Sequence, residues 1–321
     1  MRNRRWFLVI SMLVSPNQPP IQILNGPQYL VRGFSPTQRH FRDRFSGVPQ
    51  GAVRGLRAAG CGNLLYMTRG MDKNEHFIDR WLQSVAPDTH APDVRICLEL
   101  PKVREQTLAD LAEVVKEHFI GAKTLKIWER LPNCANLVEN KLPTSKRIQS
   151  GDLGEIIATE YATAKTTFKV PIKRLRWKDD RNTSMRGDDA IGYKVEDARV
   201  RVLKVESKSR ANLTPSTVTE ANEELLRNDG RPNPSTLAFI ASRLREDDRD
   251  DEAMLFERLQ TGEAGTYLVE HMLFTLSGNN PKTALGTKLT TTKRVSRRHL
   301  VGVVVVDHQD FIQAVFSKAN A

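Results

Sequence analysis

Residues 198–208 carry the clearest strand pattern of the chain, because valine alternates with arginine before the run ends in Glu206-Ser207-Lys208. Side chains two positions apart on a strand point to the same side of a sheet, so Glu206 and Lys208 should project from one face. The pattern therefore predicts a carboxylate and an ammonium group held next to each other at a strand end. The same spacing also suits a salt-bridged edge strand with no chemical role.

The segments around this strand predict a mixed α/β core. Apolar residues recur at helical spacing from Leu153 to Ala164 and form one stripe. The expected order is a helix at 152–165, a strand at 169–178, a hairpin of 187–192 and 198–208, and a helix at 215–227. A later strand is expected at 299–307, where consecutive valines predict burial on both faces of a sheet.

The chain as a whole predicts three regions. Residues 1–70 are rich in proline, glycine and arginine without sustained periodicity and predict an extended arm, residues 71–144 a small α+β accessory region, and residues 145–321 the main domain. Further elements are expected as a strand at 93–100 and as helices at 107–121, from Pro234 onward and at 267–276. The acidic residues at 246–252 lack the ligand spacing of a calcium loop, so they predict a solvated turn.

The charge balance favours a polyanionic partner. The 321 residues carry a formal net charge of +11 and a pI of about 9.7, so the surface should attract nucleic acid. Residues 165–186 contain eight lysines and arginines, and residues 281–299 contain six. Phosphate contacts are expected from the second run, at Lys293, Arg294, Arg297 and Arg298. A merely solvated basic surface would carry the same residues.

The cysteines and the N-terminus argue against a secreted protein. Cys61, Cys97 and Cys134 are widely spaced and form no Cys-x-x-Cys pair, so neither a disulfide framework nor a zinc knuckle is expected. Residues 1–14 resemble the charged and apolar parts of a signal peptide, but no clear cleavage site follows, and Met12 is an alternative start. The apolar stretch is too short to span a bilayer. We expect a cytoplasmic protein without a membrane partner.

Acidic residues also stand just before the hairpin, in Gly187-Asp188-Asp189. One of these aspartates and Glu206 would give two carboxylates for a hard cation, with Lys208 near an attacking water. Successive strand residues face opposite sides, so only one aspartate can point at Glu206. Asp189 is favoured, because Asp188 after Gly187 also suits a turn. Asp189 and Glu206 are then the expected metal ligands.

The helix at 152–165 offers a further carboxylate, from Glu155 or Glu160. Glu155 shares a face with Ala158 and Ala162, small residues that would let the helix lie close to a sheet, although its spacing from Asp152 also suits a capping box. Glu160 falls inside the apolar stripe, where a carboxylate costs free energy unless it is paired or bound to a metal. The two alternatives stay open on this ground.

The Asp189, Glu206 and Lys208 pattern resembles the PD-(D/E)XK superfamily of restriction-endonuclease-like nucleases. The resemblance implies an αβββαβ core, Mg²⁺ bound by Asp189 and Glu206 with Mn²⁺ as an alternative metal, and Lys208 orienting water or stabilising charge on the phosphorane. A glycine shortly before a glutamate in the first helical turns is part of the family pattern and favours Glu155. No proline precedes the aspartate, at a position that the superfamily varies freely.

Residues 151–155, 186–192 and 203–208 together resemble the HamA family, the nuclease subunits of the Hachiman anti-phage defence system. The resemblance covers the chain from about residue 145 onward and implies DNA as substrate and a superfamily-2 helicase subunit, HamB-like, as partner. Two alternatives remain, a stand-alone restriction or repair nuclease and a non-catalytic DNA-binding or assembly subunit with a nuclease-like fold. Loss of activity usually removes one of the three motif residues, and here all three are present.

Overall fold

The structure is a computed structural model that describes residues 75–85, 93–197, 199–262 and 267–321. The predicted arm at 1–70, the leader-like segment and Met12 lie outside the described residues. Among the described residues, no helix is both long and apolar enough to cross a membrane.

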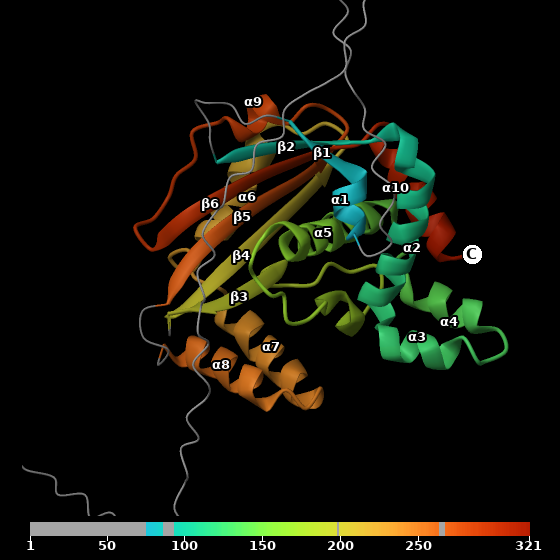
Figure 1. Cartoon of the computed structure of the whole chain (residues 1–321), viewed down its shortest axis with the longest axis horizontal. Coiled ribbons are helices and arrows are strands. Elements are labelled where there is room, and N and C mark those ends of the chain that lie inside the picture. The colour runs from blue at the N-terminus through green and yellow to red at the C-terminus, as the bar shows by residue number, and fades with distance from the viewer. Residues whose placement is uncertain (1–74, 86–92, 198, 263–266) are drawn as a thin grey trace, which may run out of the picture. The chain divides into compact units, whose positions relative to one another are not determined.

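One mixed sheet forms the centre of the described part of the chain (Figure 1). Its strands are β1 (Leu82–Ser84), β2 (Val94–Glu99), β3 (Ala190–Glu196), β4 (Arg199–Arg210), β5 (Leu268–Ser277) and β6 (Val295–Val304). They lie in the order β1-β2-β6-β5-β4-β3. β2, β6, β5 and β4 run parallel, while β1 and β3 pair antiparallel at the two edges. Residues before 145 therefore contribute two strands to the same sheet as the candidate site.

Helices cover both faces of this sheet. They are α1 (Phe77–Trp81), α2 (Arg104–Ile120), α3 (Ala122–Trp128), α4 (Cys134–Lys141), α5 (Lys146–Lys165), α6 (Pro215–Leu226), α7 (Pro234–Glu246), α8 (Asp250–Thr261), α9 (Lys282–Leu285) and α10 (His308–Ala319). Two short 3₁₀ helices span Pro101–Val103 and Arg174–Trp177. Figure 1 shows α5 crossing one face, with α2 and α10 beside it, and α7 and α8 paired next to β3.

The core divides according to the faces of the strands. Met272 and Phe274 of β5 belong to the large cluster that includes α5, α2 and α10. Leu273, between them in sequence, packs with α6, α9 and Leu300 on the opposite face. A third cluster joins α7 and α8 to Ile191 of β3. Because β4, β5 and β6 are covered on both sides, polar groups on them must find partners within the protein.

α5 lies close to β4 because Gly154 has no side chain. A Cβ atom at this position would come within 3.0 Å of the Ser209 Cβ and 3.9 Å of the Ser207 Oγ. Ala158 and Ala162 are fully buried on the same helix. These small residues bring Glu155, which follows Gly154, against the end of the sheet where β4 terminates.

The mixed α/β class predicted from the sequence is confirmed, and so are the strands near 93–100 and 198–208 and the helices near 107–121, 152–165 and 215–227. The helix starting at Pro234 is confirmed as α7, and the acidic cluster contains the turn between α7 and α8. The strand expected at 299–307 is β6, which begins four residues earlier, at Val295.

The strand predicted at 169–178 is wrong. Only Lys169 forms an isolated bridge, opposite Tyr193, and the chain then turns through the 3₁₀ helix Arg174–Trp177. Pro171 interrupts the segment, and proline cannot donate a ladder hydrogen bond. Two strands, not three, therefore lie between α5 and α6 in the described residues.

The helix predicted at 267–276 is also wrong, because these residues form β5, a central strand of the sheet. Its residues are apolar at consecutive positions, since both of its faces are covered. Such a run has the same appearance in a buried helix and in a buried strand, so periodicity does not separate the two.

Candidate functional site

Gly187 positions the two aspartates ahead of β3. Its φ angle is +94°, and a Cβ atom there would meet the Thr236 Oγ1 at 2.4 Å, so both backbone conformation and space require glycine. The hydroxyl of Thr236 accepts a hydrogen bond from the Asp188 backbone N–H at 3.1 Å. This contact fixes the turn from which the two carboxylates diverge.

Asp189 lies beside the end of β4. Ala190 pairs with Val205 in the β3–β4 register, so the preceding Asp189 falls opposite Glu206. One of its oxygens accepts hydrogen bonds from the backbone N–H and the hydroxyl of Ser207, both at 2.8 Å. The strand that carries Glu206 and Lys208 therefore also orients Asp189.

Glu155 reaches the same place from α5 through Arg174. The Arg174 Nε and Nη2 donate to the two oxygens of Glu155 at 2.7 and 2.8 Å, and Nη2 also donates to Asp189 at 3.0 Å. Arg174 Nη1 donates to the Arg186 carbonyl at 3.1 Å, which ties the guanidinium to the loop before β3. Burial raises the pKa of Glu155 to about 7, although Arg174 acts in the opposite direction.

Glu206 and Lys208 form an ion pair at the end of β4. Burial, and then the neighbouring Asp189 carboxylate, raise the pKa of Glu206 well above its usual range, while Lys208 opposes the shift. A raised pKa means that the ionised carboxylates lack full compensation by nearby positive charge. We call the five residues Glu155, Arg174, Asp189, Glu206 and Lys208 the carboxylate–lysine site.

Asp188, the first alternative to Asp189, faces a different environment. It is buried, and its oxygens contact the Lys204 ammonium at 3.3 Å and accept from the Asn233 backbone N–H at 2.7 Å. Lys204 in turn donates to the carbonyls of Glu224, Arg227 and Arg231. Asp188 thus holds the connections around α6 and α7 together and does not join the carboxylate–lysine site.

Glu160, the alternative to Glu155, also lies in a separate cluster. Its carboxylate contacts His118 Nε2 at 2.8 Å, His76 Nε2 at 3.1 Å and Lys173 Nζ at 2.9 Å. Burial opposes ionisation of Glu160, but the hydrogen bonds from His118 and His76 outweigh it and hold its pKa far below the usual range. The apolar stripe thus carries a paired carboxylate that links α5 to α1 and α2.

The oxygen donors of the carboxylate–lysine site suit a hard divalent cation such as Mg²⁺. Among the described residues, however, no group of three or more His, Cys, Asp or Glu side chains is arranged so that it could hold a metal ion. Arg174 instead engages both oxygens of Glu155 and one of Asp189. Glu155, Asp189 and Glu206 are the carboxylates that would hold such a cation, and binding it through Glu155 and Asp189 would require Arg174 to give up its contacts with them.

A groove of about 610 Å³ opens next to Lys208. We call it the basic groove, because Lys146, Arg147, Lys208 and Arg210 line it together with His308 and one carboxylate, Asp310. The hydroxyls of Ser150, Ser184, Ser207 and Ser209 add neutral hydrogen-bonding groups. Cations interleaved with hydroxyls are typical of surfaces that contact a phosphate backbone.

The basic residues predicted to bind nucleic acid lie at the other end of the sheet. Arg297 pairs in register with Glu270 near the start of β5 and β6, whereas Leu300, three positions further on, lies in register with Leu273 and Glu206. Arg294 is ion-paired with Asp229. Lys293 and Arg297 are exposed, and Arg298 is half-buried. Their predicted phosphate contacts thus lie apart from the basic groove.

Sequence reasoning missed Arg174 and the basic groove. Arg174 belongs to the basic run at 165–186, but its neighbours Lys173 and Arg176 have the same charge and turn elsewhere, so composition does not single it out. The groove combines the start of α5 with the end of β4 and the start of α10, which are remote in sequence. Only the packing of α5 and α10 against β4 brings these groups together.

The described chain is thus a mixed α/β protein with three acidic side chains, an arginine and a lysine at one end of its sheet. A profile of the HamA family matches residues 75–319, and the chain belongs to this family. It is similar to the Hachiman protein HamA of Bacillus cereus, with 27% identity over 180 residues, which make up 56% of this chain and 64% of that protein. The match thus spans less than two thirds of the relative's length.

Proposed function

We propose that this chain is a metal-dependent deoxyribonuclease with a restriction-endonuclease-like core and that it acts as the effector of an anti-phage defence complex. One observation carries the proposal: Arg174 joins Glu155 to Asp189, Asp189 falls opposite Glu206 in the β3–β4 register, and Lys208, the ion-pair partner of Glu206, lines the basic groove. The raised pKa values of Glu155 and Glu206, caused mainly by burial, support it, because strongly perturbed carboxylates cluster at functional sites.

The side chains have distinct roles in this proposal. Glu155, Asp189 and Glu206 hold Mg²⁺, or Mn²⁺ in its place. When bound there, such a metal would supply an activated water and would offset charge that develops on the phosphate. Lys208, held by Glu206, orients the water or stabilises charge on the phosphorane, and Ser207 fixes Asp189 through its N–H and hydroxyl.

The basic groove supplies the substrate contacts. Lys146, Arg147 and Arg210 are exposed at its rim, where they would pair with phosphates on either side of the reacting bond. Backbone contacts of this kind position a nucleic acid but do not read its sequence. A DNA-degrading effector with little sequence preference is the function that these contacts favour.

Membership of the HamA family supports the place of the chain in Hachiman defence. The family resemblance of the motifs supplies the proposed partner, a superfamily-2 helicase subunit. We propose that the partner controls access of DNA to the carboxylate–lysine site. The activity and the partner are both tested by the same biochemical experiment.

The experiment incubates purified protein with plasmid DNA and Mg²⁺, alone and with the co-expressed helicase subunit. The double variant Glu206→Ala, Lys208→Ala should lose cleavage and phage protection while its circular dichroism spectrum stays unchanged. A matched variant, Arg245→Ala, Glu257→Ala, removes an exposed ion pair on α7 and α8 and should behave as the unmodified protein. DNA binding without cleavage in every condition would favour the non-catalytic alternative, and cleavage by a folded Glu206→Ala, Lys208→Ala variant would refute the site.

A further inference from the structure

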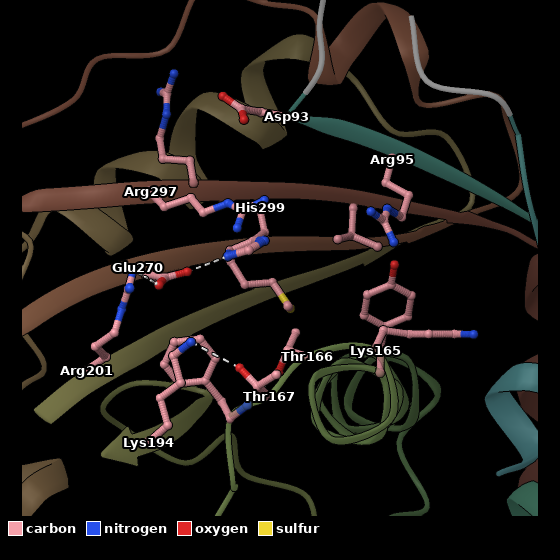
Figure 2. Close-up of a pocket in the computed structure, with 15 residues that line it drawn as sticks. Asp93, Arg95, Lys165, Thr166, Thr167, Lys194, Arg201, Glu270, Arg297 and His299 are labelled. Atoms are coloured by element: carbon pink, nitrogen blue, oxygen red, sulfur yellow. Dashed lines mark hydrogen bonds and ion pairs between the residues drawn. The ribbon is translucent and has the colours of Figure 1, made fainter. Parts of the chain in front are cut away.

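A second pocket lies on the α5 face near the start of β4, β5 and β6 (Figure 2). Its volume is about 280 Å³, and we call it the arginine pocket. Its wall contains six cationic side chains, from Arg95, Lys165, Lys194, Arg201, Arg297 and Arg298. Asp93 and Glu270 supply its carboxylates, and Thr167 and His299 also line it. On β4, Arg201 precedes Glu206 by five residues, or roughly 17 Å of strand, so this pocket is separate from the carboxylate–lysine site.

Positive charge predominates in the arginine pocket. Six lysine and arginine side chains line it, against the two carboxylates of Asp93 and Glu270, which leaves an excess of four positive charges in the wall. Lys165 and Lys194 each also pair with a carboxylate beside the pocket, so the arginines carry most of the excess. Such an excess is costly in a concave site unless an anion offsets it. The cations come from five separate elements, β2, α5, β3, β4 and β6.

Glu270 organises part of this wall and does not cancel the rest. It is buried and accepts from Arg201 and, at 2.8 Å, from His299 Nε2 (Figure 2). Burial alone would raise the pKa of Glu270, but the hydrogen bonds from His299 and Arg201 bring it below the usual range. The single buried carboxylate is thus engaged with Arg201 and His299.

Two arginines of the pocket have no carboxylate partner among the described residues, although Arg95 lies within hydrogen-bonding reach of the Tyr161 hydroxyl. Arg95 and Arg297 are exposed, and within the described residues neither has an acidic partner. On the facing wall, the Lys194 ammonium donates to the Thr167 hydroxyl at 3.0 Å, and Figure 2 shows both groups below the guanidinium groups. The pocket therefore presents the guanidinium groups of Arg95 and Arg297 across from the Lys194 ammonium and the Thr167 hydroxyl. Hydrogen-bond donors outnumber acceptors among these groups.

We propose that the arginine pocket binds a phosphate group carried by a ligand of about nucleotide size. Planar guanidinium groups recognise phosphate oxygens in pairs. A phosphate monoester carries close to two negative charges, which suits two available guanidinium groups better than a singly charged carboxylate does. The volume of 280 Å³ lies near the lower limit of ligand pockets, which are roughly 300–1,000 Å³, so it admits a terminal phosphate and its nucleoside but no duplex.

The test measures binding without metal, in the Glu206→Ala, Lys208→Ala background, so that cleavage plays no part. The probes are inorganic phosphate, ATP, a 5′-phosphorylated single-stranded oligonucleotide and the same oligonucleotide without its terminal phosphate, each followed by calorimetry. Arg95→Gln with Arg297→Gln should weaken the preferred phosphate ligand by about tenfold or more for each guanidinium removed. Lys123→Gln with Lys126→Gln, which removes two exposed cations from α3, is the matched control and should bind as before.

The pattern across the probes identifies the source of the phosphate. Preference for ATP over the oligonucleotides assigns the pocket to a free nucleotide, and preference for the 5′-phosphorylated oligonucleotide over its unphosphorylated form assigns it to a DNA end. Binding of every probe at the same strength by the unmodified pocket and by the Arg95→Gln, Arg297→Gln variant would overturn the proposal. Equal weakening of both oligonucleotides would overturn it too, because the two arginines would then contact the DNA backbone and not a terminal phosphate. None of these outcomes depends on nuclease activity.

Discussion

Arg174 donates to both carboxylate oxygens of Glu155, at 2.7 and 2.8 Å. Through Nη2 it also reaches Asp189 at 3.0 Å, so one guanidinium group pairs with two of the three carboxylates at the end of the sheet and offsets only one of their two negative charges. A divalent cation bound by the same oxygens would balance both negative charges. Arginine and metal are therefore expected to compete for Glu155 and Asp189.

Replacing Arg174 tests this competition. Arg174→Gln leaves buried carboxylates without their cation, which should lower the free energy of unfolding by about 3–5 kcal/mol in metal-free buffer at pH 8. Mg²⁺ should then raise the melting temperature of the variant more than that of the unmodified protein, because the binding free energy of the metal adds to stability. Differential scanning calorimetry with and without Mg²⁺ measures both effects.

The control for this substitution is Arg186→Gln, in the same connection and exposed. It should change neither the stability nor the response to Mg²⁺. An equal Mg²⁺ response in the Arg174→Gln, Arg186→Gln and unmodified proteins would argue that the guanidinium and the metal do not share ligands.

The two adjacent aspartates should separate stability from chemistry. Asp188→Asn weakens the contacts with Lys204 and the Asn233 N–H and should lower the free energy of unfolding by about 1.5–3 kcal/mol. Asp189→Asn keeps one oxygen for Ser207 and relieves the repulsion with Glu206, so it should lower stability less than Asp188→Asn does but reduce Mg²⁺-dependent cleavage by on the order of 100-fold or more. Urea unfolding and plasmid cleavage, measured on both variants, give the comparison. A reversed pattern would exchange the roles of the two residues.

The basic groove should determine the salt dependence of DNA binding. Removing one lysine or arginine that pairs with a phosphate reduces the slope of log affinity against log salt by about 0.9 for duplex DNA. Lys146→Gln, Arg147→Gln and Arg210→Gln together should lower it by roughly 2.7, measured by fluorescence anisotropy in a metal-free salt series. Charge-matched replacement of Lys123, Lys126 and Arg130, all exposed on or near α3, should leave the slope unchanged.

A second set of variants compares the run at the other end of the sheet. Charge reversal at Arg294, Arg297 and Arg298 should also flatten the slope if these residues contact phosphates, although Arg294 is already paired with Asp229. Co-purification with the helicase subunit is measured on the same protein. An unchanged slope with no co-purification would assign this run to the partner instead of DNA.

His271 should make the fold sensitive to acid. Its ring is buried and contacts the Gly230 carbonyl at 2.8 Å, and burial lowers its pKa to about 4, with Lys204 and Arg298 acting in the same direction and Asp188 against them. Because the folded-state pKa lies below the ordinary 6.5, this group's contribution is present above pH 6.5 and is lost as the pH falls through 4. Between pH 7.5 and 4.5 the loss should be on the order of 2 kcal/mol.

The His271→Gln variant keeps a donor for Gly230 but cannot take up the proton. Its stability should therefore fall less over the same pH range, even though it is less stable at neutral pH. Urea unfolding at pH 7.5 and 4.5 measures the difference, and parallel pH profiles for the two proteins would exclude His271 as the titrating group.

The sequence predicted those parts of the fold that depend on local pattern. The alternating valines placed Glu206 and Lys208 correctly on one strand, and the stripe from Leu153 to Tyr161 placed α5. β5 was mistaken for a helix because burial on both faces removes the alternation that distinguishes a strand. Arg174 was not predicted, because its contacts depend on a 3₁₀ turn in a segment expected to be extended.

The choice between neighbouring carboxylates shows the same limit. Alternation allowed only one of Asp188 and Asp189 to face Glu206, and Asp189 was preferred because Asp188 after Gly187 also suits a turn. The structure gives the two residues separate partners, Ser207 and Arg174 for Asp189 and Lys204 for Asp188. For Glu155 and Glu160, the positions on the helix left both open, and the family resemblance favoured Glu155. Only the positions of His118 and Lys173 around Glu160 separate them, and such long-range neighbours leave no trace in the local pattern.

The pairing of β2 with β6 has a consequence for synthesis of the protein. Val94 lies opposite Leu300, about two hundred positions further along the chain, so β2 leaves the ribosome long before its partner exists. The backbone N–H and C=O groups of β2 that pair with β6 therefore stay without this partner until all residues between the two strands have been translated. A ribosome that stalls or stops before β6 would release a chain with an unpaired β2 edge and an open sheet, a form suited to proteolysis or aggregation.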